Sequence, residues 1–558
     1  MTFVDEYPDE ARIVRWCFVV AFSALGIGGL FGLIQAWHRT GAYRGVVSNT
    51  DYYTILTAHG VLLALVFTTF FLCGIFTWGV TRSLDRSLPS HRFSQLWFWL
   101  MTVGTVLAAV TILGGIVPWI PLHASVLYTF YAPLQAHPLF YVGLALLVVG
   151  SWLAGADWFR AFFAWREEHP DERIPLQTFM VLTTMLMWYL SSFGVAVEVL
   201  VFLLPWSLGL ISQVDPLVTR TLFWYFGHAV VYFWLLPAYF VWYTILPKLS
   251  GGRLLSDPLA RVVFILFLLL STPVGFHHQY LDPGVPEGFK FVAMTNTMFL
   301  LLPSLLTAFT VVGSMEHGAR QRGGTGRIAW LKSLPWDDPA FVGCALAGLM
   351  FAAGGFSGMI NAGMNINYLI HNSIWVPGHF HLTVGTAAAL TFMAISYWLV
   401  PQVTGKRLRW RGMALLQPYT WFLGMTLMSN AMHREGLSGV PRRTAVPQYP
   451  DVTFQGVVGT IGEMRLQIAL GAFLLFTALC MFLAVMIATW LGHRGHDLSV
   501  NGSIPAPLSG PEAGPRVLDN LRLWMVIAIV LVIIAYALPM ASFAADGILV
   551  PGSPPFPM

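Results

Sequence analysis

The sequence predicts an all-α membrane protein, a single-domain bundle of about 13 transmembrane helices over residues 1–558. Composition and patterning both support this fold class. Of the residues, 56% are hydrophobic and 10% are charged, whereas soluble domains carry about a quarter charged residues. Apolar runs of about 20 residues, the length that crosses a bilayer, recur along the chain and leave no room for a soluble domain. No basic run suggests nucleic acid as a partner.

The predicted helices follow one another through polar connections. Read by length and hydropathy, they cover residues 13–36, 53–80, 94–119, 138–162, 176–204, 219–247, 260–282, 290–314, 338–360, 370–401, 415–434, 465–492 and 520–543.

The distribution of lysine and arginine predicts how the bundle is oriented. Basic residues gather after every second helix, while the loops after the third, fifth and ninth helices carry none. The positive-inside rule then places the N-terminus in the cytoplasm and the C-terminus outside. One outside loop breaks the rule, because it holds Arg434, Arg442 and Arg443. Either this loop is an isolated deviation or its arginines have an anionic partner there.

Six histidines fall inside apolar helices, where polar residues are costly and usually mark a functional site. They are His59, His228, His277, His278, His379 and His381. The helical rise places all six roughly 8–16 Å below the outer edge of an apolar layer about 30 Å thick. Four helices distant in sequence therefore bring imidazoles to one depth, whereas unrelated core histidines would be scattered.

The spacing of the histidines predicts their roles. His379 and His381 are two residues apart, so they point about 200° apart on a helix and can serve two planar cofactors on opposite faces. His277 and His278 lie near a helix end beside Pro273 and Gly275, where a loosened backbone could turn both rings inward.

A histidine and a tyrosine also share a helix face. His228 and Tyr232 are four residues apart and therefore lie within contact of each other. An ordinary hydrogen bond is the commoner reason for such a pair, so its redox role stays open on spacing alone.

The number of histidines suits a partition among three metals. Three imidazoles (His228, His277 and His278) match a copper ion with an open position. His59 with either His379 or His381 makes a six-coordinate haem, and the remaining histidine makes a five-coordinate haem that can face the copper. Zinc would also accept three histidines, but it leaves the other three unexplained.

Three blocks around these histidines resemble the haem-copper oxygen reductases: TLFWYFGHAVVYFWLLPAY, STPVGFHHQYLDPG and IHNSIWVPGHFHLTVG. The resemblance covers essentially the whole chain and is greatest to subunit I of the B-family, the ba-type cytochrome c oxidases. The A-family has a glutamate between the copper histidine and its tyrosine, where this chain has Ala229, Val230 and Val231. The C-family takes its tyrosine from another helix, whereas Tyr232 follows His228 by one turn.

The resemblance implies a role for each site residue. His59 and His381 are similar to the ligands of a low-spin haem b, His379 to the ligand of a high-spin haem, and His228, His277 and His278 to the ligands of one CuB-type copper ion. An a-type macrocycle is expected at the high-spin site, where a-, o- and b-type macrocycles can share axial ligands. Tyr232 resembles the tyrosine that is joined to its histidine and supplies an electron and a proton to dioxygen cleavage. The remaining implied residues are Phe380 in electron transfer, and Arg442, Arg443, His371, Asn367, Tyr128 and Trp224 in cofactor binding.

Hydroxyl groups on the cytoplasmic side of Tyr232 match the single proton path of the B-family. They belong to Tyr239, Tyr243, Ser256, Ser304, Thr307 and Thr310. Serine and threonine in membrane helices often bond only to their own backbone, which is the alternative interpretation.

One departure concerns Asn367, since B-family relatives have an aspartate there; asparagine cannot ionise, so a pumping role through this residue is in doubt. Glu198 is another ionisable group within a helix, and the sequence assigns it no role.

The leading hypothesis is a terminal respiratory oxidase that reduces dioxygen to water in a prokaryotic plasma membrane and couples the reaction to proton uptake and pumping. The cysteines, Cys17, Cys73, Cys344 and Cys480, stand singly, so a dinuclear copper site is expected on a subunit II that receives electrons from cytochrome c or a similar donor. A small accessory membrane subunit is also expected. The alternatives are nitric oxide reduction, a quinol donor, and a transporter or channel without haem.

Overall fold

The computed structural model describes residues 2–43, 45–117, 119–445, 460–495 and 504–551. The elements of the first half are α1 (Phe3–Glu6), α2 (Pro8–Thr40), α3 (Asn49–Gly60), η1 (Val61–Phe67), α4 (Thr68–Leu84), α5 (His91–Gly114), α6 (Pro138–Glu168), α7 (Leu176–Val197), η2 (Glu198–Leu203), α8 (Leu204–Ser207), β1 (Gln213–Val214) and α9 (Pro216–Leu249). Those of the second half are α10 (Asp257–Leu270), η3 (Gly275–Gln279), α11 (Glu287–Phe299), α12 (Leu301–Gln321), η4 (Ala329–Ser333), α13 (Pro339–Ala362), α14 (Met364–Ile370), α15 (Trp375–Leu382), η5 (Thr383–Ala388), α16 (Ala389–Thr404), α17 (Arg411–Leu437), α19 (Ile461–Trp490), η6 (Pro511–Ala513), η7 (Arg516–Asp519), α20 (Leu521–Asp546) and β2 (Val550–Pro551).

The all-helical membrane architecture is confirmed. In the described ranges, 11 helices are long and apolar enough to cross a membrane, several of them continuous through a π-helical turn. The predicted spans 260–282 and 415–434 are not among them. The first corresponds to α10, which has 14 residues and gives way to irregular backbone, and the second to α17, which has 27 residues but is more polar. The count of 13 and the sidedness therefore remain predictions.

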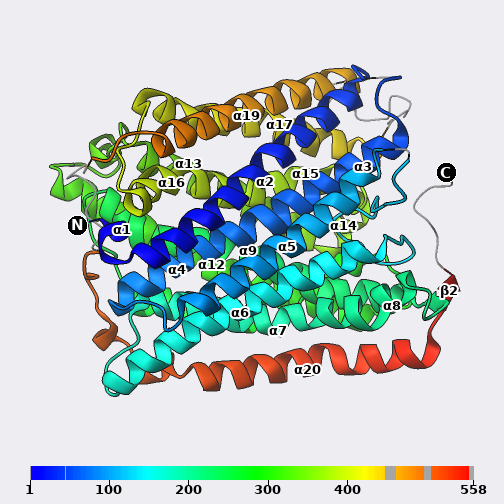
Figure 1. The fold of residues 1–558 in the computed structure, drawn as a ribbon, viewed down its shortest axis with the longest axis horizontal. Coiled ribbons are helices and arrows are strands. Elements are labelled where there is room, and N and C mark those ends of the chain that lie inside the picture. The colour runs from blue at the N-terminus through cyan, green and yellow to red at the C-terminus, as the bar shows by residue number, and fades with distance from the viewer. Residues whose placement is uncertain (1, 44, 118, 446–459, 496–503, 552–558) are drawn as a thin grey trace.

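The long helices run side by side along the longest axis of the molecule (Figure 1). The N-terminus lies at one end of this bundle, which we call the N-terminal face, and the C-terminal strand β2 lies at the opposite face. Helix α20 lines one edge and α19 lines the opposite edge, and α2 runs obliquely across the bundle to reach the edge near α19. The β1 and β2 strands pair antiparallel through Gln213–Pro551 and Val214–Val550, which ties the C-terminal segment to the start of α9.

The helices that carry His59, His228 and the His379–His381 pair are the most deeply buried spans. The most apolar window of α9 is 89% buried, and those of the α3–α4 and α15–α16 spans are 83% buried, whereas that of α20 is 22% buried. Helix α9 begins at Asp215, whose carboxylate accepts the backbone N–H groups of Leu217 and Val218, with Pro216 at the first helical position. The central helices thus provide a rigid frame for the histidines.

Candidate functional site

A cluster of three imidazoles lies at the centre of the bundle. Ligand atoms of His228, His277 and His278 all lie within 4.8 Å of one another. His228 comes from α9, while the other two come from η3, the short 3₁₀ turn that follows irregular backbone after α10. The early end of α10 therefore turns two adjacent rings toward α9. Thr297 on α11 lies 2.7 Å from His277 Nδ1, which fixes that ring.

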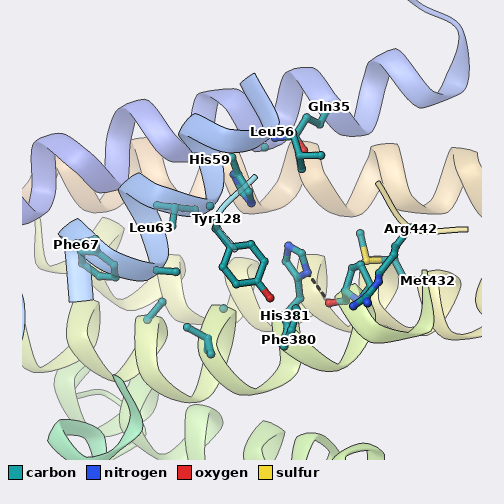
Figure 2. Close-up of a pocket in the computed structure, with 18 of the residues that line it drawn as sticks. Gln35, Leu56, His59, Leu63, Phe67, Tyr128, Phe380, His381, Met432 and Arg442 are labelled. Carbon is teal, nitrogen blue, oxygen red and sulfur yellow. Dashed lines mark hydrogen bonds between the residues drawn. The ribbon is translucent and has the colours of Figure 1, made fainter. Parts of the chain in front are cut away.

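A second pair of imidazoles faces a separate cavity of about 320 Å³ (Figure 2). The rings of His59 and His381 are 6.4 Å apart between centroids, with planes 21° apart. Their Nδ1 atoms are occupied, by Gly28 O at 2.8 Å and by Pro377 O at 2.7 Å, which leaves both Nε2 atoms for a ligand. Two metal–nitrogen bonds of about 2 Å and two ring radii span a distance of about 6 Å, so the pair fits one metal between the rings.

His379 faces the opposite side of α15 and lines a second cavity, of about 170 Å³, which is also lined by the three-histidine cluster and Tyr232. Its Nδ1 lies 2.9 Å from Ser357 Oγ and 3.1 Å from Gly354 O on α13. This leaves Nε2 for a ligand, and the fixed ring orientation is typical of metal-binding histidines. The structure thus separates His379 and His381 into two cavities, as their spacing predicts.

Two π-helical turns begin close to His59 and His381, the two histidines of the larger cavity. Segment η1 starts two residues after His59, and η5 starts two residues after His381. Such turns insert an extra residue into a helix and are frequent at functional sites. They re-aim the helix directly beside the cavity, and nothing in the hydrophobic pattern of the sequence indicates them.

Glycines leave space beside both rings. A methyl group at Gly32 would lie 2.8 Å from His59 Cε1, and one at Gly358 would lie 3.0 Å from His379 Cε1. These distances are shorter than ordinary carbon contacts of about 3.5–4.0 Å. Only glycine therefore lets these helices approach the imidazoles so closely, and no pattern in the sequence marks either residue.

Two consecutive arginines stand at the rim of the larger cavity. Arg442 and Arg443 line it, and neither forms an ion pair with a carboxylate of the described residues. Burial, with the neighbouring guanidinium second, lowers the pKa of Arg442 to about 10, so it still carries its charge at neutral pH. Buried charges require partners. The pair fits the carboxylates of a cofactor, which is the anionic partner considered from the sequence.

Aromatic side chains separate the two cavities. Phe380 and Trp224 line both of them. Trp224 stacks on His278 with ring centroids 4.0 Å apart, and Tyr128 meets Phe380 edge-on at 6.3 Å. The ring of Tyr232 lies 4.9 Å from that of His228. Phe380 is thus the residue that links the His379 and His381 sides.

Asn367 and His371 form a polar pair in the wall of the smaller cavity. His371 Nδ1 lies 2.8 Å from Asn367 Oδ1, and Asn367 Nδ2 donates to Asn361 O at 2.6 Å. The asparagine therefore holds the histidine by a neutral hydrogen bond.

Most of the predicted hydroxyl row is brought together between α9 and α12. Tyr239 Oη lies 3.2 Å from Ser304 Oγ, and Tyr243 donates to Thr307 Oγ1 at 2.7 Å. Thr307 and Thr310 also donate to carbonyl groups of their own helix, as the alternative interpretation anticipates. Ser256 is not hydrogen-bonded to this row in the described residues; its hydroxyl caps α10 by accepting from Leu259 N.

Comparisons with known proteins agree with this geometry. The family model described as "Cytochrome C and Quinol oxidase polypeptide I" matches residues 12–474. Cytochrome c oxidase subunit 1 of Thermus thermophilus is 41% identical over 544 residues, 95% of this chain and 94% of that protein. Cytochrome c oxidase polypeptide 1 of Halobacterium salinarum is 26% identical over 478 residues, 80% of this chain and 76% of that protein.

A solved structure extends the match to three dimensions. The cryo-EM structure of a heme-copper terminal oxidase dimer covers 99% of this chain and 96% of its own, with a TM-score of 0.90 and 35% identity. The family match, the identity and the fold confirm the resemblance inferred from the three histidine blocks. The chain therefore belongs to the cytochrome c and quinol oxidase polypeptide I family and is a haem-copper oxidase subunit I.

Proposed function

We propose that this chain is the catalytic subunit of a terminal respiratory oxidase that reduces dioxygen to water with four electrons and couples the reaction to proton uptake and pumping. The observation that carries the proposal is the arrangement of four imidazoles around one cavity: a cluster of three, and His379 reaching in from α15. A transporter with a histidine gate has no need of the second, separate imidazole pair beside this cavity.

The donor sets suggest which group each would hold. His59 and His381 would hold a low-spin haem b, His379 a high-spin haem of a-type, and the three-histidine cluster one copper ion. When bound, these groups supply electron transfer to the cavity and the metal pair at which dioxygen is reduced. Arg442 and Arg443 would bind haem carboxylates, with charge-assisted hydrogen bonds that orient the macrocycles.

The protein around these groups would position them and deliver protons to the cavity. Tyr232 stands one turn from His228 and faces the cavity, so its phenol can give a proton there. Apolar and aromatic side chains exclude bulk water from the cavity walls. Phe380 is in contact with both cavities and is suited to close the gap between the two haem sites.

Protons would reach Tyr232 along the hydroxyl row, from the N-terminal face, which we place in the cytoplasm. The Tyr239–Ser304 and Tyr243–Thr307 contacts supply two consecutive steps of this row. Because the threonines donate to backbone carbonyls, water molecules would complete the relay. Asn367 cannot ionise, so pumping in this chain would rely on other groups near His371.

Electrons would come from a partner, because the four cysteines of this chain stand singly and do not form a dinuclear copper motif. The proposed partners are a subunit II with such a site, a cytochrome c or similar soluble donor, and a small accessory membrane subunit. The proposed location is a prokaryotic plasma membrane.

The test of this function is oxygen consumption by the Tyr232→Phe variant of the purified complex. Loss of the phenol proton should nearly abolish oxygen turnover while reduced spectra and carbon monoxide binding persist. A fully active variant would refute the role of Tyr232. Copper analysis separates the alternative: nitric oxide reduction predicts an additional iron in place of copper.

A further inference from the structure

Two residues extend the hydroxyl row of α12 beyond the proton path proposed above. Ser304, Thr307 and Thr310 are followed at helical spacing by Ser314 and His317, so all five lie on one side of the helix. Thr310 and Ser314 are fully buried, whereas His317 is half-buried. The row therefore runs from the cavity to the N-terminal face, and His317 is its surface member and its one ionisable imidazole.

The loop between α9 and α10 rests on the end of this row. Leu255 N donates to Ser314 Oγ at 2.9 Å, and Arg253 N donates to His317 Nδ1 at 3.3 Å. The loop packs closely against α12, since a methyl group added at Gly318 would lie 2.4 Å from Ser250 Oγ at the start of the loop. The loop therefore covers Ser314 but reaches His317 only through one long hydrogen bond.

A strap formed by residues 504–519 holds this loop in place. Its backbone pairs with the loop through Leu508 N to Leu254 O at 2.7 Å and Ser509 N to Leu255 O at 3.1 Å. Arg253 donates from its side chain to two strap carbonyls, at 2.6 and 2.7 Å. At the far end, the fully buried Arg261 bonds to Asp257 and Asp519. Loop and strap thus form one layer over the row, with His317 at its margin.

We infer that His317 is the proton-accepting group at the mouth of the hydroxyl path; this inference rests on the proposed function. Neutral His317 carries its proton on Nε2, because Nδ1 accepts the Arg253 N–H. A bond of 3.3 Å is at the long end of the range and is easily displaced. The incoming proton binds Nδ1 when the Arg253 N–H is displaced. The proton on Nε2 then leaves, so the ring returns to its neutral form.

Ser314 is suited to receive that proton through water. Its hydroxyl donates to Thr310 O and accepts from Leu255 N, which leaves one lone pair for a water molecule. The charged groups nearest this mouth are Arg253 on the loop, Arg322 at the end of α12, and the ion pair of Arg320 with Glu316 at 2.6 Å. None of them belongs to the buried row, so within the part of the chain that the structure describes His317 is the titratable member of the row that reaches the surface.

The experiment compares His317→Ala with a matched control in the purified oxidase complex. His169→Ala removes a histidine from the same face at the end of α6, where the ring stacks on Trp165. Reduced and carbon monoxide spectra first establish that both variants retain the metal site. Proton uptake is then followed with a pH-indicating dye after mixing the reduced enzyme with dioxygen, with and without added imidazole.

The expected result is proton uptake slowed at least about tenfold in His317→Ala, partial recovery with imidazole, and a wild-type rate in His169→Ala. Slowing without recovery indicates a structural effect and overturns the inference, as does a wild-type rate. Thr307→Val tests the proton path itself, independently of its mouth. If Thr307→Val is slow while His317→Ala is normal, the path stands and His317 is not its mouth; if both are normal, the proposed path itself is wrong.

Discussion

The space beside His59 leads to a quantitative prediction for Gly32→Ala. The added methyl carbon would lie 2.8 Å from Cε1 and 3.0 Å from Nδ1 of the ring. To restore ordinary contact, the ring has to retreat by roughly 0.7 Å. That movement breaks the 2.8 Å hydrogen bond to Gly28 O and also strains the neighbouring helix. A lost hydrogen bond costs about 1 kcal/mol and overpacking about 1–3 kcal/mol.

The resulting loss of about 2–4 kcal/mol corresponds to binding of the low-spin haem weakened by at least about 30-fold. The assay is the amount of low-spin haem per protein, from reduced spectra and haem extraction. The high-spin haem, which binds carbon monoxide, should be retained because Gly32 does not line its cavity. Gly26→Ala is the control, since on the same helix its methyl group meets only the flexible end of Leu483 at 3.1 Å. Wild-type low-spin haem content in Gly32→Ala would refute the reasoning.

Three further predictions test other parts of the site. Thr307→Val removes the acceptor of the Tyr243 hydroxyl and should slow oxygen turnover about tenfold or more without altering the haem spectra; unchanged turnover would remove Thr307 from the proton path. Ser357→Ala takes away one of the two hydrogen-bond partners of His379 Nδ1. The imidazole should then be a weaker electron donor to the iron, and the reduction potential of the high-spin haem should rise by roughly 20–60 mV in a redox titration. An unchanged potential would show that Ser357 does not tune the ligand. Glu198 is fully buried, and neither of its carboxyl oxygens has a hydrogen-bond partner among the described residues. Glu198→Leu should therefore keep the free energy of unfolding or raise it by up to about 3 kcal/mol. A lower thermal unfolding temperature in the variant would contradict this.

The sequence predicts the membrane bundle and the grouping of the histidines because both depend on simple periodicities. Hydrophobic length identifies the spans, and the two-residue spacing of His379 and His381 already requires that they face opposite cavities. The adjacent Pro273 and Gly275 similarly indicate the loosened turn at His277. These features are local, so no knowledge of the neighbouring helices is needed to infer them.

The features that the sequence does not predict depend on contacts between distant helices. The π-helical turns after His59 and His381 arise where the helices pack, and no residue pattern marks them. Ser357 and Gly32 act only through the space beside an imidazole of another helix. Ser256 lies near the row in sequence order, but it caps α10 instead, because the strap at Ser509 fixes the loop.

The most direct test of the account is the metal and haem content of the purified complex, measured with reduced-minus-oxidised spectra with and without carbon monoxide. We expect two haems and one copper per copy of this chain, with one haem binding carbon monoxide. The His59→Ala variant should lose only the low-spin spectrum. Additional iron without copper would indicate nitric oxide reduction, and absence of haem would contradict the proposed function altogether.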